Sequence, residues 1–257
     1  MRGFRERWTR LRTGRALLPA AARPWALIFT VACAVVTVVI GVLVAHQQVP
    51  AGIDRAVDEP IISGLGLHQE LLLRTAQLGS PVPVLVLSVV IVVSCLLAGR
   101  LNGAILGALA APVADGLDEL VLKPLFHRAD LGFVSYPSGH TTAVFALGTT
   151  VTVLLAFPPA GSRLATARRA LIPLAAFLLG CAVAVSLIGL RWHYFSDTVG
   201  GAAVAIGTVS GLALLLDLPA TRRMLSRIAA DRAGEKFAPD GRAAGLPGKR
   251  LAGPRAG

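Results

Sequence analysis

The sequence predicts an all-α integral membrane protein, a polytopic bundle with six transmembrane helices. Two features of its composition lead to this prediction: 54% of the 257 residues are hydrophobic and only 15% are charged. A soluble domain is usually about 25% charged. The mean hydropathy is +0.69, and the apolar residues gather in long runs, which is typical of helices that cross a bilayer.

Six runs are candidates for transmembrane helices, since about 20 apolar residues cross the hydrocarbon core. They cover residues 25–45, 82–98, 101–122, 140–157, 170–190 and 198–216. The second run is short, at about 17 residues, and the third contains Pro112, Asp115, Asp118 and Glu119. We expect the unfavourable features of these two runs to face other helices rather than lipid. Residues 68–79, HQELLLRTAQLG, form an amphipathic stretch that suits the membrane surface.

The distribution of basic residues predicts the orientation. With the N-terminus in the cytoplasm, 20 of the 25 Lys and Arg residues lie on that side, as the positive-inside rule requires. The net charge of +11 is therefore a topology signal, and no nucleic-acid partner is expected. We expect a basic cytoplasmic segment (1–24), a membrane domain (25–218) and a basic, disordered cytoplasmic tail (219–257). The first helix is expected to stay uncleaved in a bacterial-type cell membrane.

The outer side keeps five basic residues: Arg55, Arg74, Lys123, Arg128 and Arg191. The last three fall in two outer segments, 123–139 and 191–197, which also hold or adjoin His140, His193 and Asp197. Charges without a function would rarely concentrate in this way. The pattern predicts an anion-binding site at the outer membrane surface.

The motif Pro-Ser-Gly-His, residues 137–140, begins the fourth run. Pro137 and Ser138 can start a helix, and Gly139 lets a ligand approach the backbone. The free amides of the first helical turn carry the positive end of the helix dipole and suit a phosphate group. His140 would then stand beside that phosphate, able to give or take a proton. An interfacial histidine that follows a helix cap is the alternative.

A second histidine precedes the sixth run in RWHYFSDTVGG, residues 191–201. His193 and Asp197 share a face if this backbone is helical, and the chain can fold one onto the other if the helix begins at Ser196 or Asp197. A carboxylate that holds one imidazole nitrogen makes the other a better nucleophile. A structural pair that caps two helices is the alternative.

The third element is LKPLFHRADLG, residues 122–132. Lys123 and Arg128 can supply positive charge to phosphate oxygens. Glu119 lies four residues before Lys123, so a helical salt bridge is the alternative for the lysine. The acidic residues near Glu119 lie along one helix end, which favours helix packing over a metal site, and no metal or other cofactor is expected.

Together the three elements resemble the type 2 phosphatidic acid phosphatase superfamily, which includes membrane lipid phosphatases and vanadium haloperoxidases. That family has, in this order, a Lys/Arg motif, a Pro-Ser-Gly-His motif and a motif that ends in His-x-x-x-Asp. The resemblance covers roughly residues 101–216 and implies a helical bundle and a phosphohistidine mechanism. Two positions depart from the pattern, because Asp130-Leu131 replaces the usual Arg-Pro and Leu187 replaces the arginine of the third motif. Arg128 and Arg191 are the expected substitutes.

The resemblance implies a metal-independent phosphatase that acts on a phosphorylated lipid at the extracytoplasmic face. The lipid would be a polyprenyl diphosphate or a lipid like phosphatidic acid. His193 would attack phosphorus, Asp197 would orient His193, and His140 would serve as acid and base. The phosphate-binding groups would be Lys123, Arg128, Ser138, Gly139 and Arg191. A lipid phosphotransferase that uses an alcohol acceptor, or a non-catalytic protein that binds or transports lipid phosphates, is the alternative.

Overall fold

The computed structural model describes residues 16–225, apart from residues 48, 51, 131–132, 157–165, 220 and 222. Most of the two predicted basic segments, at the chain ends, therefore lies outside the described residues, as does Leu131. The helices, in chain order, are η1 (Ala20–Ala22), α2 (Arg23–Val44), α3 (Ile53–Leu65), α4 (Gln69–Ala76), η2 (Gln77–Gly79), α5 (Pro81–Leu97), α6 (Leu101–Leu117), the π-helical turn η3 (Asp118–Leu122), α7 (Lys123–Phe126), α8 (Gly139–Ala156), α9 (Thr166–Gly189) and α10 (Phe195–Asp217).

Each of the six predicted runs coincides with one long helix, and the ends agree within four residues when η3 is counted with α6. Three stretches, Ala20–Val44, Ala170–Gly189 and Phe195–Asp217, are long and apolar enough to cross a membrane. A fourth is reached if Gln69–Gly79 and Pro81–Leu97, which meet at a bend of 48°, count as one span. By length and composition the described residues thus support three or four crossings, fewer than the six predicted.

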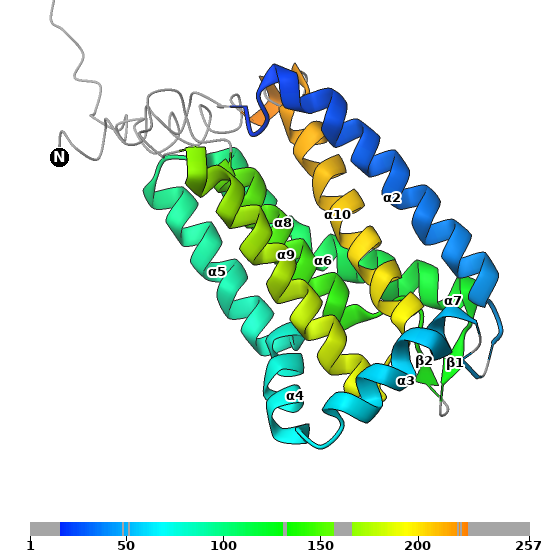
Figure 1. Ribbon diagram of the computed structural model, residues 1–257. Coiled ribbons are helices and arrows are strands. Elements are labelled where there is room, and N and C mark those ends of the chain that lie inside the picture. Colours follow the sequence, from blue (N-terminus) through cyan, green and yellow to red (C-terminus); the bar gives the residue numbers. More distant parts are fainter. Residues whose placement is uncertain are drawn as a thin grey trace, which may run out of the picture.

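The long helices form one bundle in which α10 is central (Figure 1). It packs against α2, α8 and α6, while α5 covers α6 and α9 covers α8. Small residues permit this close packing: a Cβ added at Gly207 of α10 would lie only 3.0 Å from the Cβ of Cys33 on α2. The outer helices α2, α5 and α9 instead expose large apolar side chains, such as Leu43, Val82 and Leu178. Such a surface suits lipid, and it identifies an integral membrane protein.

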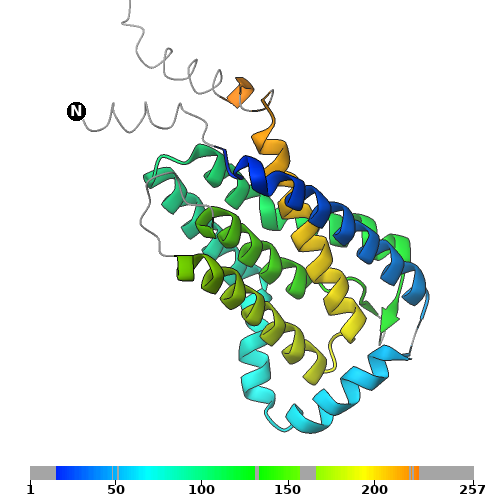
Figure 2. The same ribbon diagram turned by 45° about the horizontal axis from the view of Figure 1, so that its top comes forward.

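The shorter elements gather at one end of the bundle, where α2 ends and α10 begins (Figures 1 and 2). They are α3, α4, α7 and a small antiparallel hairpin of β1 (Ala129–Asp130) and β2 (Phe133–Val134). The predicted amphipathic stretch 68–79 is helical, as α4 and η2, and it buries Leu72 and Ala76. This end of the bundle also carries the predicted site residues.

Candidate active site

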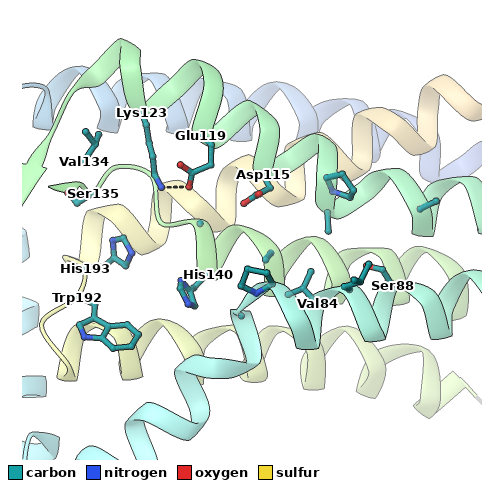
Figure 3. A pocket seen from close by; sticks show the side chains of 18 of the residues that line it. Val84, Ser88, Asp115, Glu119, Lys123, Val134, Ser135, His140, Trp192 and His193 are labelled. Carbon is teal, nitrogen blue, oxygen red and sulfur yellow. Dashed lines mark hydrogen bonds and ion pairs between the residues drawn. The ribbon is translucent and has the colours of Figure 1, made fainter.

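A cavity of about 1130 Å³ opens at this end of the bundle and extends between α5, α6 and α8. Its polar end carries His140, His193, Lys123 and Arg191, together with the acidic residues Asp115 and Glu119. Figure 3 shows the labelled histidines and Lys123 at one end, with Val84 and Ser88 of α5 farther along. Most of the remaining wall is apolar, from Val84, Leu85, Val89, Val92, Ala108, Ala111 and Pro112. The predicted residues therefore meet in a cavity that joins polar groups to an apolar wall.

The histidine of the third motif lies just before α10, not on it. Tyr194 caps that helix, and the carboxylate of Asp197 accepts the Tyr194 backbone N–H at 3.0 Å. The chain thereby folds back, so that Nδ1 of His193 lies 3.6 Å from Oδ2 of Asp197. The side chain of Asp197 is fully buried, whereas that of His193 is 14% exposed. Since Nδ1 faces the carboxylate, Nε2 is the nitrogen left to face a substrate.

The Pro-Ser-Gly-His turn is held directly against α10. The backbone N–H of Ser138 donates to the carbonyl of Asp197 at 3.0 Å. A Cβ at Gly201 would lie 2.5 Å from the carbonyl oxygen of Ser138, so glycine is needed for this approach. The amide of Ser138 is therefore already occupied, and Ser138 is buried outside the cavity lining, contrary to its predicted contact with phosphate. Gly139 does line the cavity, at the start of α8.

His140 is positioned by contacts on two sides. Its ring packs edge-on against Trp192, with 6.1 Å between the ring centroids. A Cβ at Gly79 would lie 2.6 Å from the carbonyl oxygen of His140 and 3.0 Å from its Cα, so the bend between α4 and α5 presses on the first turn of α8. Both histidines thus reach the cavity from well-packed backbone.

Lys123 makes the salt bridge that the spacing allowed: its Nζ pairs with a carboxylate oxygen of Glu119 (Figure 3). Its side chain is 16% exposed and lines the cavity. Two further carboxylates lie near the start of α8, since a Cβ at Gly139 would be 3.7 Å from Oδ1 of Asp115 and 3.8 Å from Oδ2 of Asp118. Among the described residues, however, no group of three or more His, Cys, Asp or Glu side chains is arranged to hold a metal ion.

Arg191 reaches the cavity from a turn rather than from a helix face, because α9 ends at Gly189. Its N–H bonds to the carbonyl of Ile188, and that of Trp192 bonds to the carbonyl of Leu187, both at 2.9 Å. These two bonds define a Schellman motif, in which the position of Arg191 is usually glycine. Arg191 has a φ of 60°, a left-handed conformation that is unfavourable for a residue with a Cβ. A strained arginine at the mouth of a cavity indicates a function for its side chain.

Arg128 does not line the cavity, in contrast to its predicted role as a phosphate ligand. The guanidinium is fully buried, with Nη1 2.6 Å from Asp197 and Nη2 2.6 Å from Asp54. Its carbon also stacks 4.4 Å from the ring centroid of Tyr194. Burial alone lowers the pKa of Arg128, but the two carboxylates outweigh burial and raise that pKa above its usual value. Arg128 is thus a permanent buried cation behind the His193–Asp197 pair.

Two aspartates of α3 were missed by the sequence reasoning. Asp54 accepts the backbone N–H of Ser196 at 2.8 Å, and Asp58 accepts that of Phe195 at 3.1 Å. Burial and the negative charge of Asp54 raise the pKa of Asp58 to about 6. The signal in the sequence was their spacing, since two acids four residues apart occupy one face of a helix. The spacing alone does not show that this face of α3 packs against α10.

Ser135 is a further residue that the prediction did not use. It lies in the cavity wall, 3% exposed, and its hydroxyl has no hydrogen-bond partner in the described structure. Its backbone N–H donates to the carbonyl of Arg128 at 2.8 Å. The hydroxyl is thus free to contact a ligand in the cavity.

The fold and the site together define a helical membrane protein with a histidine–aspartate pair, a second histidine and two cations around one cavity. Residues 112–222 match the family model of the PAP2 superfamily. The matched segment contains all three motifs, and the match confirms the predicted resemblance to this superfamily. No curated protein sequence matches the chain.

A solved structure has a similar fold: the crystal structure of the first transmembrane PAP2 type phosphatidylglycerolphosphate phosphatase from Bacillus subtilis. The two share 16% sequence identity with a TM-score of 0.55. The match covers 83% of this chain and 98% of the other. At this level of identity the match supports the fold of the bundle.

Proposed function

We propose that this protein is an integral membrane phosphatase that hydrolyses the phosphate monoester or diphosphate of a lipid. The observation that carries the proposal is the cavity, which joins His140, His193, Lys123 and Arg191 to an apolar wall from α5 and α6. Phosphate chemistry needs the polar end, and a lipid chain needs the apolar wall. The match of residues 112–222 to the PAP2 superfamily model supports the same reaction class. Polyprenyl diphosphates and lipids like phosphatidic acid both fit this description.

In the first step, Nε2 of His193 attacks the phosphorus atom, and the bond from phosphorus to the lipid oxygen breaks. Asp197 holds Nδ1 of His193 and stabilises the positive charge that the imidazole acquires. His140 donates a proton to the departing oxygen, so that the lipid leaves as a neutral alcohol or, from a diphosphate, as a protonated phosphate. The phosphoryl group is now bonded to His193.

In the second step, water attacks the phosphohistidine. His140, now neutral, takes a proton from the water, the nitrogen–phosphorus bond breaks, and inorganic phosphate leaves. Arg191, Lys123 and the amides of the first turn of α8 stabilise the charge on the transferring group. Lys123 is already paired with Glu119 and would have to bind the phosphate beside that carboxylate, so Arg191 is the more available of the two side-chain cations.

Six crossings of the cell membrane, with both termini in the cytoplasm, are the topology we propose. Residues 25–218 then form the catalytic domain, between the basic segments 1–24 and 219–257. The positive-inside distribution of Lys and Arg supports this orientation, and it puts the cavity at the extracytoplasmic face. The helices α5, α6 and α8, which are short for a crossing, pack in the bundle beside longer ones.

The test is phosphate release by the purified full-length protein in detergent micelles. The panel comprises phosphatidic acid, phosphatidylglycerolphosphate (the lipid in the name of the Bacillus subtilis protein) and a polyprenyl diphosphate. We expect release from at least one lipid, unchanged in EDTA, and a loss of about 10³-fold or more in His193→Ala. Activity that persists in this variant would refute the mechanism, and a requirement for a divalent metal would refute its metal independence. Transfer of phosphate to an added alcohol would identify a phosphotransferase.

A further inference from the structure

We propose that Asp54 is a positioning residue that sets the charge felt by His193, acting through Arg128 and Asp197. The inference rests on the proposed function, in which His193 is the nucleophile. Asp54 belongs to α3, outside the three motifs and outside the segment that matches the superfamily. No part of its side chain lines the cavity. Its influence must therefore pass through the side chains behind the catalytic pair.

A continuous chain of buried contacts joins Asp54 to His193. Oδ2 of Asp54 lies 2.6 Å from Nη2 of Arg128, and Nη1 of the same guanidinium lies 2.6 Å from Oδ1 of Asp197. The other oxygen of Asp197, Oδ2, faces Nδ1 of His193 at 3.6 Å. The side chains of Arg128 and Asp197 are fully buried, and that of Asp54 is 3% exposed. Water therefore screens these charges little.

The net charge of the three side chains Asp54, Arg128 and Asp197 determines the electrostatic potential at His193. Arg128 alone would neutralise Asp197, because a buried guanidinium and a carboxylate in contact form a neutral pair. Asp54 supplies a second carboxylate to the same guanidinium, so the group of three carries a net charge of −1. That charge keeps Asp197 able to stabilise a positive imidazole at His193. Without Asp54, the group would be neutral, and His193 would be a weaker base and nucleophile.

Asp54 also holds the backbone that carries the pair. It accepts the N–H of Ser196 at 2.8 Å and the Ser196 hydroxyl at 2.9 Å, and that hydroxyl lies 2.6 Å from Nη1 of Arg128. A substitution at Asp54 can thus act through charge or through misplaced backbone. The two effects are separable, because a charge effect reverses its sign when the charge of Arg128 is removed instead.

Other charged groups around His193 bear on its protonation, and they come from each element around the cavity: His140 of α8, Lys123 of α7, Glu119 of η3, Asp115 of α6 and Arg191 after α9. Asp58 of α3 lies beside Asp54 and Asp197, and burial and the charge of Asp54 raise its pKa to about 6, so its titration is compared with that of the double variant. A nucleophilic histidine must be deprotonated, so kcat/KM rises with pH through its titration. The acid limb of the pH profile therefore reports the charge that His193 experiences.

The experiment measures kcat and KM for phosphatidic acid, or for whichever lipid of the panel the wild type cleaves, between pH 5 and 9. Asp54→Asn is expected to move the acid limb to lower pH and to reduce kcat more than KM changes. Arg128→Gln is expected to move it to higher pH, and the double variant is expected to lie near the wild type. Each shift is up to about one pH unit, for unit charges roughly 10 Å apart at an effective dielectric constant of about 20.

Glu59→Gln is the matched control, because Glu59 is on the same helix but its side chain is 71% exposed. This variant should keep the wild-type profile. Asp54→Glu keeps the charge and should restore the acid limb even where kcat stays reduced.

Shifts of the same sign in Asp54→Asn and Arg128→Gln, or no shift in either, would overturn the inference. If Asp54→Asn does not fold, the comparison of Arg128→Gln with the double variant decides, because these two proteins differ only in the charge of residue 54: a lower acid limb in the double variant supports the inference, and an equal limb overturns it. If kcat/KM of Arg128→Gln falls while the acid limb stays in place, Arg128 binds phosphate directly. This result would refute the proposed influence of Asp54 on His193 through Arg128 and Asp197. Failure of the proposed function is distinct, since the wild type would then release phosphate from no lipid of the panel.

Discussion

Replacing Arg191 by glycine is expected to raise the stability of the protein while it lowers the activity. Arg191 occupies the left-handed position of a Schellman motif, with a φ of 60°. This conformation costs a residue with a Cβ roughly 1–2 kcal/mol. The greater freedom of glycine in the unfolded chain offsets about 0.4–1 kcal/mol of the relief. The free energy of unfolding of Arg191→Gly should therefore rise by about 0.5–1 kcal/mol.

Activity should move in the opposite direction. Arg191 lines the cavity, and the other side-chain cation there, Lys123, is paired with Glu119. Loss of one preorganised group that stabilises transition-state charge typically costs about 10²- to 10³-fold in kcat. Arg191→Lys keeps both the charge and the strained backbone, so it should lose less activity and gain no stability. Arg191→Ala should lose the activity and keep most of the strain.

The assay pairs phosphate release from a lipid phosphate with the melting temperature of the purified protein in the same detergent. The expected rise for Arg191→Gly is about 1–3 °C. Wild-type kcat/KM in both the glycine and the alanine variant would remove Arg191 from the site. A melting temperature that falls in Arg191→Gly would refute the account of backbone strain, whatever the activity.

Two further predictions concern packing and titration. Gly79→Ala must displace the first turn of α8, because the new Cβ would lie 2.6 Å from the carbonyl oxygen of His140. Its kcat should therefore fall about 10-fold or more. Gly64→Ala is the control and should match the wild type, because no atom lies within 4 Å of a Cβ added there. Asp58 has a pKa raised from 3.8 to about 6 by burial and by the charge of Asp54, so its proton stabilises the folded state and stability is lost as pH rises from about 4 to 6. At pH 7.5 the free energy of unfolding of Asp58→Asn should therefore exceed that of the wild type by about 1–2 kcal/mol, and its melting temperature should be higher. Near pH 4 the two proteins should match, and an equal difference at both pH values would contradict this.

The helices of the bundle were predictable because local sequence determines the position and length of each. A run of some 20 apolar residues indicates a helix of that length, and Pro81 and Gly139 mark the starts of α5 and α8. The pairing of His193 with Asp197 was also within reach, since four residues separate them. Of the two backbone routes that the sequence allowed, the structure has the second: α10 begins at Phe195, and His193 folds back onto the helix instead of sharing its face.

The role of Arg128 was not predictable in this way, since its two carboxylate partners, Asp54 and Asp197, lie 74 positions earlier and 69 positions later in the chain. Local spacing placed Arg128 near the phosphate, but only the position of α3 across the end of the bundle shows that two carboxylates already hold it. The occupied amide of Ser138 has the same cause, because its acceptor is the carbonyl of Asp197 on another helix. Long-range contacts of this kind depend on tertiary packing, and a motif describes only its own neighbourhood.

The depth of the cavity has a consequence for how lipids are told apart. Its wall follows α5 from Pro81 to Val92, a helical rise of roughly 16 Å. Near that level α5 and α6 close on each other, since a Cβ at Gly107 would lie 2.7 Å from Cγ2 of Ile91. Under the proposed function, a lipid chain longer than this depth would continue among the bilayer lipids, so the protein would contact only the part nearest the phosphate. Substrates that differ at the far end of their tails would then bind alike, and the protein would select among them by their headgroups.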